Sequence, residues 1–204
     1  MPLQFVLASS SVYRQKQLRT IGLPFSIDKP EIDETPFPEE PAKDLAVRLA
    51  EAKCTVVAAR HPEGIIIASD QVAESPDGQI LGKPGTLENA TRQLRHFSGK
   101  TVNFHTALCV KDQSNNRSNC IIETFTVHFR QLSTNQIIQY LELEKPFDCA
   151  GSFKAEGLGV RLFSALQGRD HNTLIGLPIM ALIDTLLNWG IDPLDYVTPN
   201  LKNL

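Results

Sequence analysis

The run Gly64–Val72, which reads GIIIASDQV, constrains the fold more than any other part of the chain. Its first half is mostly apolar and rich in β-branched residues, which is typical of a strand buried on both faces. Three polar residues follow directly: Ser69, Asp70 and Gln71. An α/β protein usually places its chemistry at the end of a core strand, so Asp70 is the first candidate for a catalytic residue. The alternative is a strand that ends at water and carries an acid only for solubility.

Length and charge narrow the classes of protein to consider. The chain has 204 residues, enough for one sizeable core or a two-lobed single domain. A net charge of −3, with scattered lysines and arginines, gives no reason to expect nucleic acid as a partner. The apolar piece 5–8 is too short for a signal peptide or membrane span, so no membrane partner is expected. The four cysteines form no C-x-x-C pair, which disfavours zinc and favours reduced thiols in the cytoplasm.

The N-terminal segment has the pattern of a phosphate site. Leu3–Ala8 predicts a strand, and the three serines that follow lead into a helix to about residue 20. Free N–H groups and the helix dipole at such a start attract phosphate. Arg14, one turn past Ser10, projects from the same side of the first turn. The glycines of a Walker loop are missing, and an ordinary helix cap with a solvated arginine is the alternative.

A second strand is predicted over Phe25–Ile32, before a proline-rich loop that begins with Asp33 and Glu34. These adjacent carboxylates are either exposed turn residues or ligands for a hard cation such as Mg²⁺. In the helix expected over 42–60, Lys53 lies on the flank of the apolar stripe. A flank lysine can extend along the core edge toward a strand end, although most such lysines only contact solvent.

After the buried strand, Gly82 and Pro84 form a stiff loop that would fix the direction of Lys83. A helix and two strands joined by a polar hairpin-like loop are expected next. His105 and His128 lie in these strands with no second ligand at metal spacing. Both are therefore interpreted as structural.

Cys149–Gly157, which reads CAGSFKAEG, is the second informative stretch. Its small residues leave room for a ligand beside the backbone. Lys154 and Glu156 are two residues apart, so in an extended segment both face the same side. The alternative is a flexible surface loop flanked by glycines.

The C-terminal part supplies further elements of one domain. Ser133–Gln136 is a capping box that opens a helix, Val160–Leu166 suits a strand, and Gly176–Pro178 opens the last long helix. We predict a single domain over residues 1–194 and a loose tail over 195–204.

Together these residues form a set suited to a polyphosphate substrate. Cations and Mg²⁺ neutralise phosphate oxygens, and an acid holds metal or activates water. No Ser/His/Asp or Cys/His pattern competes with this interpretation. The candidates are Asp33, Glu34, Asp70, Arg14, Lys53, Lys83, Lys154 and the serines at the first helix start.

The blocks LASSSVYR, EIDET, ASDQV, GKP, VHFR, CAGSFKAEG and NTLIGLP occur in this order over about residues 3–194. In this the chain resembles the Maf family of nucleotide pyrophosphatases. The resemblance implies an α/β fold of the Maf/ITPase type, an elongated mixed β-sheet flanked by helices, with two lobes around a central cleft. It also implies hydrolysis of a nucleoside triphosphate to the monophosphate and pyrophosphate with a divalent cation (Mg²⁺, Mn²⁺ or Co²⁺), in the cytoplasm and as a homodimer.

The resemblance also implies roles for individual residues. Asp70 becomes the general base or a metal ligand, and Glu34 a metal ligand. Lys154 is expected near the phosphates or the ribose. Arg14, Lys53 and Lys83, with Ser9 and Ser10, become the residues that hold the phosphates.

Three positions resemble the 7-methyl-GTP branch of the family more than the dTTP/UTP branch: Tyr13, Gln71 and Glu156. A 7-methylguanine ring is positively charged, so an aromatic face attracts it by a cation–π contact worth about 0.5–2 kcal/mol. The Glu156 carboxylate can accept from the guanine N1–H and N2–H groups and offset that charge, and the Gln71 amide can add a base-edge contact. The branch often has Trp where Tyr13 stands, and Tyr is the weaker platform. The alternatives are a dTTP/UTP house-cleaning pyrophosphatase and a nucleotide-binding regulator of cell division with incidental hydrolysis.

Overall fold

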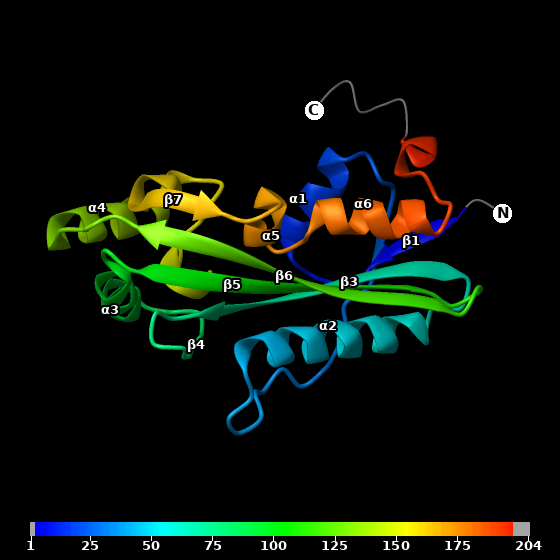
Figure 1. Cartoon of the computed structure of the whole chain (residues 1–204), viewed down its shortest axis with the longest axis horizontal. Coiled ribbons are helices and arrows are strands. Elements are labelled where there is room, and N and C mark those ends of the chain that lie inside the picture. The colour runs from blue at the N-terminus through cyan, green and yellow to red at the C-terminus, as the bar shows by residue number, and fades with distance from the viewer. Residues whose placement is uncertain (1–2, 198–204) are drawn as a thin grey trace.

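A long mixed sheet with helices on both faces forms the centre of the computed structural model, which describes residues 3–197 (Figure 1). The strands are β1 (Gln4–Leu7), β2 (Ser26–Ile27), β3 (Gly64–Glu74), β4 (Ile80–Leu81), β5 (Thr101–Asp112), β6 (Arg117–Phe129) and β7 (Phe163–Gln167). The helices are α1 (Val12–Thr20), α2 (Ala42–Ala58), α3 (Leu87–Phe97), α4 (Thr134–Glu144), α5 (His171–Ile175) and α6 (Ile179–Asn188). Three short 3₁₀ turns are η1 (Ala150–Ser152), η2 (Leu158–Leu162) and η3 (Pro193–Tyr196).

The sheet has the strand order β2-β1-β3-β5-β6-β7, with β4 paired to β3 off this path. Strand β1 runs parallel to both β2 and β3, and all other pairs are antiparallel. Strands β5 and β6 form a long hairpin, which gives the molecule its length. The predicted elongated mixed sheet is confirmed.

One edge of β3 is interrupted at its middle. Strand β1 pairs with Gly64–Ile67, whereas β4 pairs only with Ala73 and Glu74. The stretch 68–72 therefore has no strand on this side, although it pairs fully with β5 on the other. Because β1 ends here and the chain turns into α1, backbone and side-chain groups of several segments meet at this gap. Asp70 lies at its centre, and not at the end of the strand as predicted, because β3 continues to Glu74.

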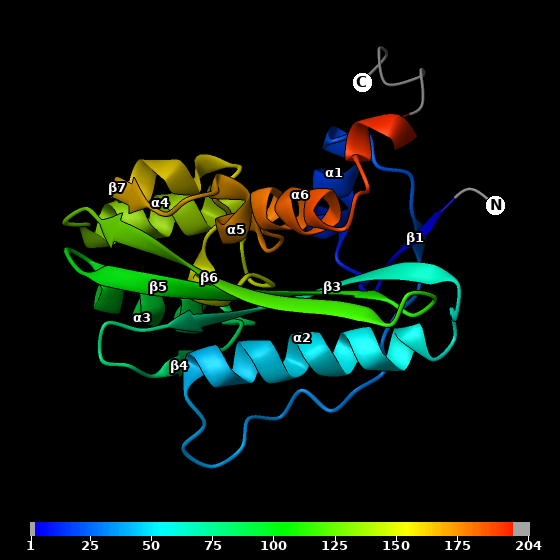
Figure 2. The same cartoon turned by 45° about the vertical axis from the view of Figure 1, so that its right-hand side comes forward.

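The helices form two lobes, one at each end of the sheet (Figures 1 and 2). Helix α2 covers the lower face at the end that holds β1, and α1, α5 and α6 cover the upper face there. Helices α3 and α4, with β7, surround the opposite end. The core of this second lobe is aromatic, with edge-to-face contacts among the rings of Phe104, Phe129, Phe153 and Phe163. The prediction of two lobes is confirmed.

Most predicted elements are present, and the helix caps are those expected. The Ser11 side chain caps α1, and Ser133 and Gln136 form the capping box that opens α4. The predicted strand over Phe25–Ile32 is only the two-residue β2, because β1 offers it two paired positions. Beyond β2 the chain turns away, with the Asp28 carboxylate bonded to Arg60.

The segment after the CAGSFKAEG motif also departs from the prediction. The predicted strand over Val160–Leu166 begins later, at Phe163, because η2 occupies the preceding residues. Helix α5 was not predicted. The Asp170 carboxylate caps it and Gly176 ends it with a positive φ of 123°.

The prediction of a tail over 195–204 falls largely on residues 198–204, which lie outside the described part of the chain. Asp195 and Tyr196, which are described, belong to η3 instead, and the Tyr196 ring packs edge-on against Phe5. None of the helices within residues 3–197 combines the length and the apolar character needed to cross a lipid bilayer.

Candidate active site

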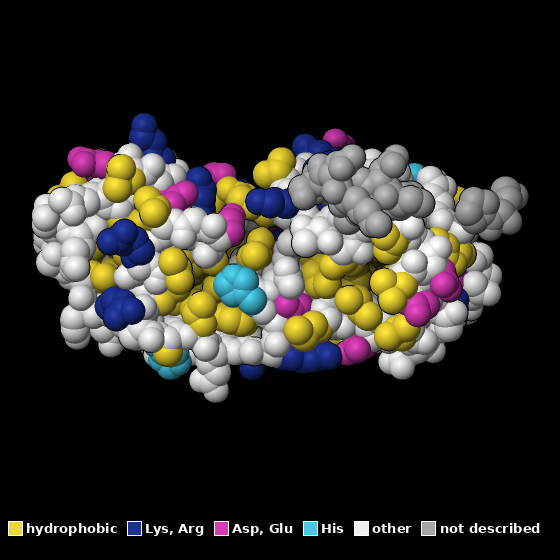
Figure 3. All heavy atoms as spheres, turned by 90° about the horizontal axis from the view of Figure 1, so that it is seen from above, with side chains coloured by type: hydrophobic (Ala, Val, Ile, Leu, Met, Phe, Trp, Pro, Cys, Tyr) yellow, Lys and Arg dark blue, Asp and Glu magenta, His cyan; other side chains and the backbone are white. Residues whose placement is uncertain are grey.

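A cleft of about 670 Å³ opens at the gap in the β3 edge, between the two lobes. In Figure 3 the outline of the molecule is indented between the lobes, and acidic and basic side chains gather there. Apart from Asp33, every residue predicted for the site lines this one cleft, which the separate sequence motifs alone did not establish. They are Ser9, Ser10, Tyr13, Arg14, Glu34, Lys53, Asp70, Gln71, Lys83, Lys154 and Glu156.

An ammonium between two carboxylates forms the centre of the cleft. Lys53 Nζ lies 2.5 Å from Asp70 Oδ1 and 2.6 Å from Glu34 Oε1. The Lys53 side chain leaves the flank of α2 and extends along the core edge to β3, as its position on the helix predicted. Lys53 and Asp70 are buried, whereas the Glu34 side chain is 58% exposed.

Burial raises the pKa of Asp70, and the positive charges of Lys53 and Arg14 only partly oppose this. Glu34, a like charge, raises it further. A carboxylate with a raised pKa is a stronger base than an exposed aspartate, and a general base works best when its pKa approaches the working pH. Asp70 is thus suited to accept a proton from water.

Glu34 reaches the cleft from the proline-rich loop between β2 and α2. Its neighbour Asp33 takes no part in the site, because its carboxylate accepts from the backbone N–H of Thr35 at 2.9 Å. This bond lowers the pKa of Asp33. Of the two adjacent acids, only Glu34 is directed at Lys53.

The β1–α1 turn supplies a helix start and an anchored arginine. Arg14 Nε donates to the carbonyl of Gly176 at 2.8 Å, and its Nη1 donates to the Ser9 hydroxyl at 3.3 Å. The Ser69 hydroxyl donates to the same Gly176 carbonyl at 2.9 Å. Arg14 is therefore fixed in direction from a segment far along the chain, with donors left for a ligand. Ser10 is exposed at the α1 start, where free backbone N–H groups can bind an anion.

The structure corrects the role predicted for the Gln71 amide nitrogen. Gln71 Nε2 lies 2.9 Å and 3.1 Å from the carbonyls of Thr173 and Leu174, and 3.0 Å from the Thr106 hydroxyl. Carbonyl oxygens only accept, so the NH₂ group must face α5. The amide nitrogen is therefore committed within the protein, and of the two polar atoms of the Gln71 side chain it is Oε1 that remains for a base edge.

Two of the predicted cations, Lys83 and Lys154, differ in whether other groups of the protein hold their ammonium groups. Lys83 is exposed and takes part in no ion pair among residues 3–197. Lys154 Nζ is instead held by the carbonyl of Glu144 at 3.2 Å and lies 3.8 Å from its carboxylate. Lys83 is thus the more available of the two for phosphate.

A second set of side chains, which we call the base end, consists of Tyr13, Asp148, Cys149 and Glu156. Burial and the nearby Cys149, Asp148 and Glu156 raise the pKa of the Tyr13 phenol, so its ring stays neutral. Asp148 and Glu156 are exposed carboxylates. The base end thus presents an aromatic ring beside two negative charges.

The family model described as "Maf-like protein" matches residues 4–189. The chain belongs to the Maf family. Two curated relatives are each named 7-methyl-GTP pyrophosphatase. One, from Idiomarina loihiensis, is 51% identical and aligns over 96% of this chain and 99% of its own. The other, from Pseudomonas aeruginosa, is 48% identical over 92% and 97% respectively.

Solved structures support the same fold for this Maf protein. The Ham1 protein of Staphylococcus aureus matches with a TM-score of 0.52 at 13% identity, covering 92% of this chain and 99% of that one. A HAM1 protein from Coxiella burnetii matches with a TM-score of 0.50 at the same identity and coverage. The predicted fold class and family are confirmed.

The donors present in this Maf cleft fit a divalent cation held jointly with a substrate. Glu34 and Asp70 face one another across a single small cation, Lys53 Nζ. Among residues 3–197, no group of three or more His, Cys, Asp and Glu side chains gathers at a possible metal site. Mg²⁺ is commonly held by one or two carboxylates together with phosphate oxygens and water, and Glu34 and Asp70 supply the carboxylates of that donor set.

Sequence reasoning missed several residues that line the cleft of this Maf protein. Lys29 adds a cation from the loop that carries Glu34, and Asp148 adds an acid just before the CAGSFKAEG motif. Proximity to a recognised motif was the signal for Asp148, whereas nothing local marks Lys29. His105 and His128 lie outside the cleft, and His105 is bonded to Thr124 and Glu74, as expected of structural residues.

Proposed function

We propose that this Maf protein hydrolyses 7-methyl-GTP to 7-methyl-GMP and pyrophosphate. The observation that carries the proposal is the pairing of Lys53 with both Asp70 and Glu34 at the centre of a cleft whose opposite end is aromatic and acidic. The names of the relatives support the same substrate.

In the proposed reaction a water oxygen bonds to the α-phosphorus while the bond from that phosphorus to the bridging oxygen breaks. Asp70 accepts one proton of the attacking water, and the bridging oxygen leaves with pyrophosphate. The raised pKa of the Asp70 carboxyl favours this proton transfer. Ionised Asp70 is therefore required, and Lys53 helps to keep it ionised.

The cations and the helix start stabilise charge that develops on the leaving group. Arg14 and Lys83 contribute donors directed into the cleft, and the α1 N-terminus adds backbone N–H groups beside Ser9 and Ser10. We propose that Lys154 lies near the ribose, because its ammonium is held at Glu144.

Glu34 and Asp70 would hold the Mg²⁺ ion that these residues fit, with Mn²⁺ or Co²⁺ as substitutes. When bound, such an ion neutralises phosphate oxygens and lowers the pKa of bound water. We also propose that the enzyme works in the cytoplasm, as a homodimer of single-domain subunits.

The base end supports a preference for a cationic base. The Tyr13 ring provides a cation–π face, and Asp148 and Glu156 supply negative charge beside it. Gln71 Oε1 can accept from a guanine N–H group. These groups therefore contribute less binding free energy to a neutral pyrimidine than to a positively charged purine.

The test is a panel of 7-methyl-GTP, GTP, UTP and dTTP with Mg²⁺, followed by pyrophosphate and orthophosphate release. We expect pyrophosphate from all that react and the highest kcat/KM for 7-methyl-GTP. A preference for UTP or dTTP would overturn the substrate, and orthophosphate release would overturn the reaction. No hydrolysis of any nucleotide would favour a binding protein that regulates cell division.

A further inference from the structure

We infer that Arg48 is a positioning residue that fixes Glu34 beside Lys53 and Asp70 by clasping the loop that carries it. This inference rests on the proposed function, since it assigns to the loop the task of presenting a metal-binding carboxylate. Arg48 lies on α2, outside the cleft, and no motif in the sequence singled it out.

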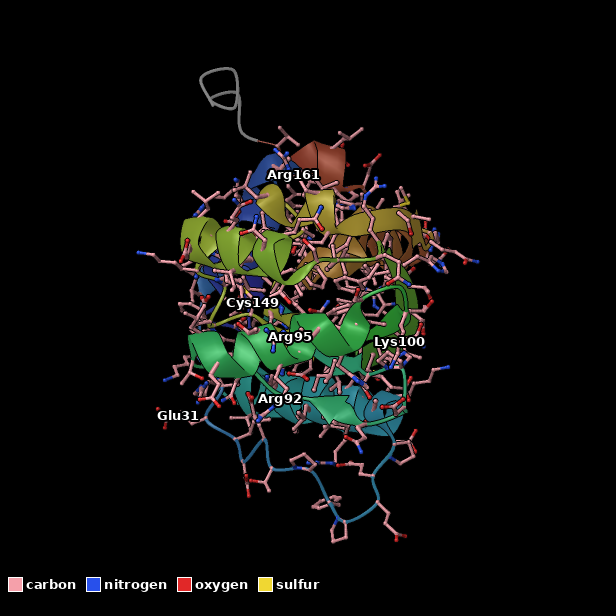
Figure 4. The ribbon with its side chains drawn as sticks, turned by 90° about the vertical axis from the view of Figure 1, so that its left-hand side faces the viewer. Glu31, Arg92, Arg95, Lys100, Cys149 and Arg161 are labelled. Carbon is pink, nitrogen blue, oxygen red and sulfur yellow. The ribbon has the colours of Figure 1, made fainter. Side chains whose placement is uncertain are left out.

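The loop over 28–41 has no strand or helix of its own to hold it. In Figure 4 the loop extends below α2, and Glu31 is labelled at its upper end. Its first part is held by Asp28, whose carboxylate accepts from Arg60 at 2.7 Å and 2.9 Å and lies 2.8 Å from His61 Nε2. The second part, which includes Glu34, depends on different contacts.

Arg48 makes three kinds of contact with this second part. Its Nε and Nη2 donate to the two oxygens of Glu40 at 2.6 Å and 2.7 Å, a bidentate pair. Its Nη2 also donates to the Thr35 carbonyl at 3.1 Å, and the guanidinium lies 4.0 Å from the centre of the Phe37 ring. We call these residues the clasp: Arg48, Thr35, Phe37 and Glu40.

The clasp extends to the backbone on both sides of Glu34. The Asp33 carboxylate accepts from the Thr35 N–H, and the Thr35 carbonyl accepts from Arg48. Glu40 accepts in turn from the Phe37 N–H at 2.9 Å, closing a turn in which Glu39 has a positive φ of 58°. The Glu34 side chain is 58% exposed and has little packing to direct it, so its approach to Lys53 depends on this fixed backbone as well as on the ion pair itself.

The electrostatics suit a positioning role and not a direct one. The bonds from Arg48 hold the pKa of Glu40 at about 2, so the pair stays ionised at any working pH. Arg48 Nε and Nη2 donate to Glu40 and Thr35, and the Phe37 ring covers one face of the guanidinium. Because the Arg48 guanidinium is bonded to the loop and lies outside the cleft, Arg48 does not bind phosphate directly and acts through Glu34.

The test uses Arg48→Ala, Arg48→Lys, Glu34→Gln and the double variant Arg48→Ala/Glu34→Gln. Arg92→Ala is the matched control, because Arg92, labelled in Figure 4, is an exposed helical arginine on α3 that donates to Asn89. Three quantities are measured: hydrogen exchange of the amides over 33–40, Mn²⁺ affinity of the protein alone by EPR, and the Mg²⁺ concentration that half-saturates pyrophosphate release.

We expect Arg48→Ala to speed exchange of the Thr35 and Phe37 amides and to weaken Mn²⁺ binding roughly tenfold, the scale seen when partners of a metal ligand are removed. The half-saturating Mg²⁺ concentration should rise by a similar factor, with a smaller fall in kcat at saturating Mg²⁺. Arg48→Lys should fall between the parent and Arg48→Ala, because lysine keeps the charge but not the bidentate geometry. Arg92→Ala should match the parent.

The double variant separates positioning from general damage. If Arg48 acts through Glu34, Arg48→Ala should cost nothing further in Mn²⁺ affinity once Glu34→Gln is present. Additive losses would overturn the inference, as would unchanged Mn²⁺ affinity in Arg48→Ala or no Mn²⁺ binding by the parent. The Mn²⁺ measurements need no substrate, so they judge the clasp even if 7-methyl-GTP is not hydrolysed and the proposed function fails.

Discussion

The two ends of the cleft are built differently. At the phosphate end, Lys53 and Asp70 are buried on regular elements, and Arg14 is held by a backbone carbonyl. At the base end, Asp148 and Glu156 are exposed and lie on a loop around η1. Only Tyr13 among the base-end side chains comes from a regular element, the first turn of α1.

The difference teaches which part of the site can change without loss of the fold. Replacing a buried, paired charge disturbs both chemistry and packing, because the partner is left without compensation. Replacing an exposed carboxylate changes the charge offered to a ligand and little else. We therefore expect the reaction to depend on the phosphate end and base selection to depend on the base end.

The largest expected effect is at Asp70. Asp70→Asn keeps the shape of the side chain but cannot accept a proton, so we expect kcat for pyrophosphate release to fall about 10³-fold. Nucleotide binding, measured by calorimetry, should remain. Asp77→Asn, an exposed acid outside the cleft, is the control. If Asp70→Asn retained its turnover, Asp70 would not be the general base, and the role proposed for the phosphate end would be wrong.

Lys53→Met should act next most strongly, with about a 100-fold loss of kcat/KM near neutral pH. Lys53 lowers the pKa of Asp70, so its removal raises that pKa further above the ordinary value. Because the ionised carboxylate is the base, the acidic limb of the pH–rate profile should move to higher pH. The exposed Lys43→Met on the same helix should leave the profile unchanged. A shift to lower pH would contradict the proposed role.

Glu156→Gln tests whether the base end selects the nucleotide base. Loss of one negative charge and one acceptor pair should lower the preference for 7-methyl-GTP over UTP by roughly tenfold. The rate with UTP should hardly change, since the phosphate end is intact. Glu142→Gln, an exposed acid on α4, serves as the control. An equal loss for both nucleotides would mean that Glu156 serves catalysis instead.

The smallest expected effect is at Tyr13. Tyr13→Leu removes a cation–π contact of about 0.5–2 kcal/mol, which corresponds to a roughly 2- to 30-fold rise in Kd for 7-methyl-GMP. Tyr13→Trp should lower that Kd by a few-fold, because indole is the better platform. Neither change should alter the Kd for UMP by as much. Equal effects on both nucleotides would break the distinction between the two ends.

The parts of the site that the sequence predicts are those fixed by local rules. The apolar run places Asp70 on a buried strand, although β3 continues past it to Glu74 instead of ending there as predicted. The helical period places Lys53 on a flank of α2, and the serines mark the start of α1. Each depends only on the spacing of nearby residues. Their convergence on one cleft follows from the strand order, which no single segment specifies.

The parts that could not be predicted depend on contacts between distant segments. The Gln71 amide is committed to α5, 102 and 103 residues further along, and Arg48 holds a carbonyl 13 residues back. Short loops between elements also resist prediction, since β2 is two residues long and the following loop has no periodicity. Local patterns carry no information on such partners.

The bond from Arg14 to the carbonyl of Gly176 joins residues 162 positions apart. During synthesis Arg14 leaves the ribosome 162 residues ahead of Gly176. A nascent chain therefore contains Arg14 long before it contains the Gly176 carbonyl that fixes the direction of the guanidinium. The ability to bind nucleotide therefore requires the segment that holds Gly176, between α5 and α6. A chain truncated before this segment keeps the early motifs and lacks the activity.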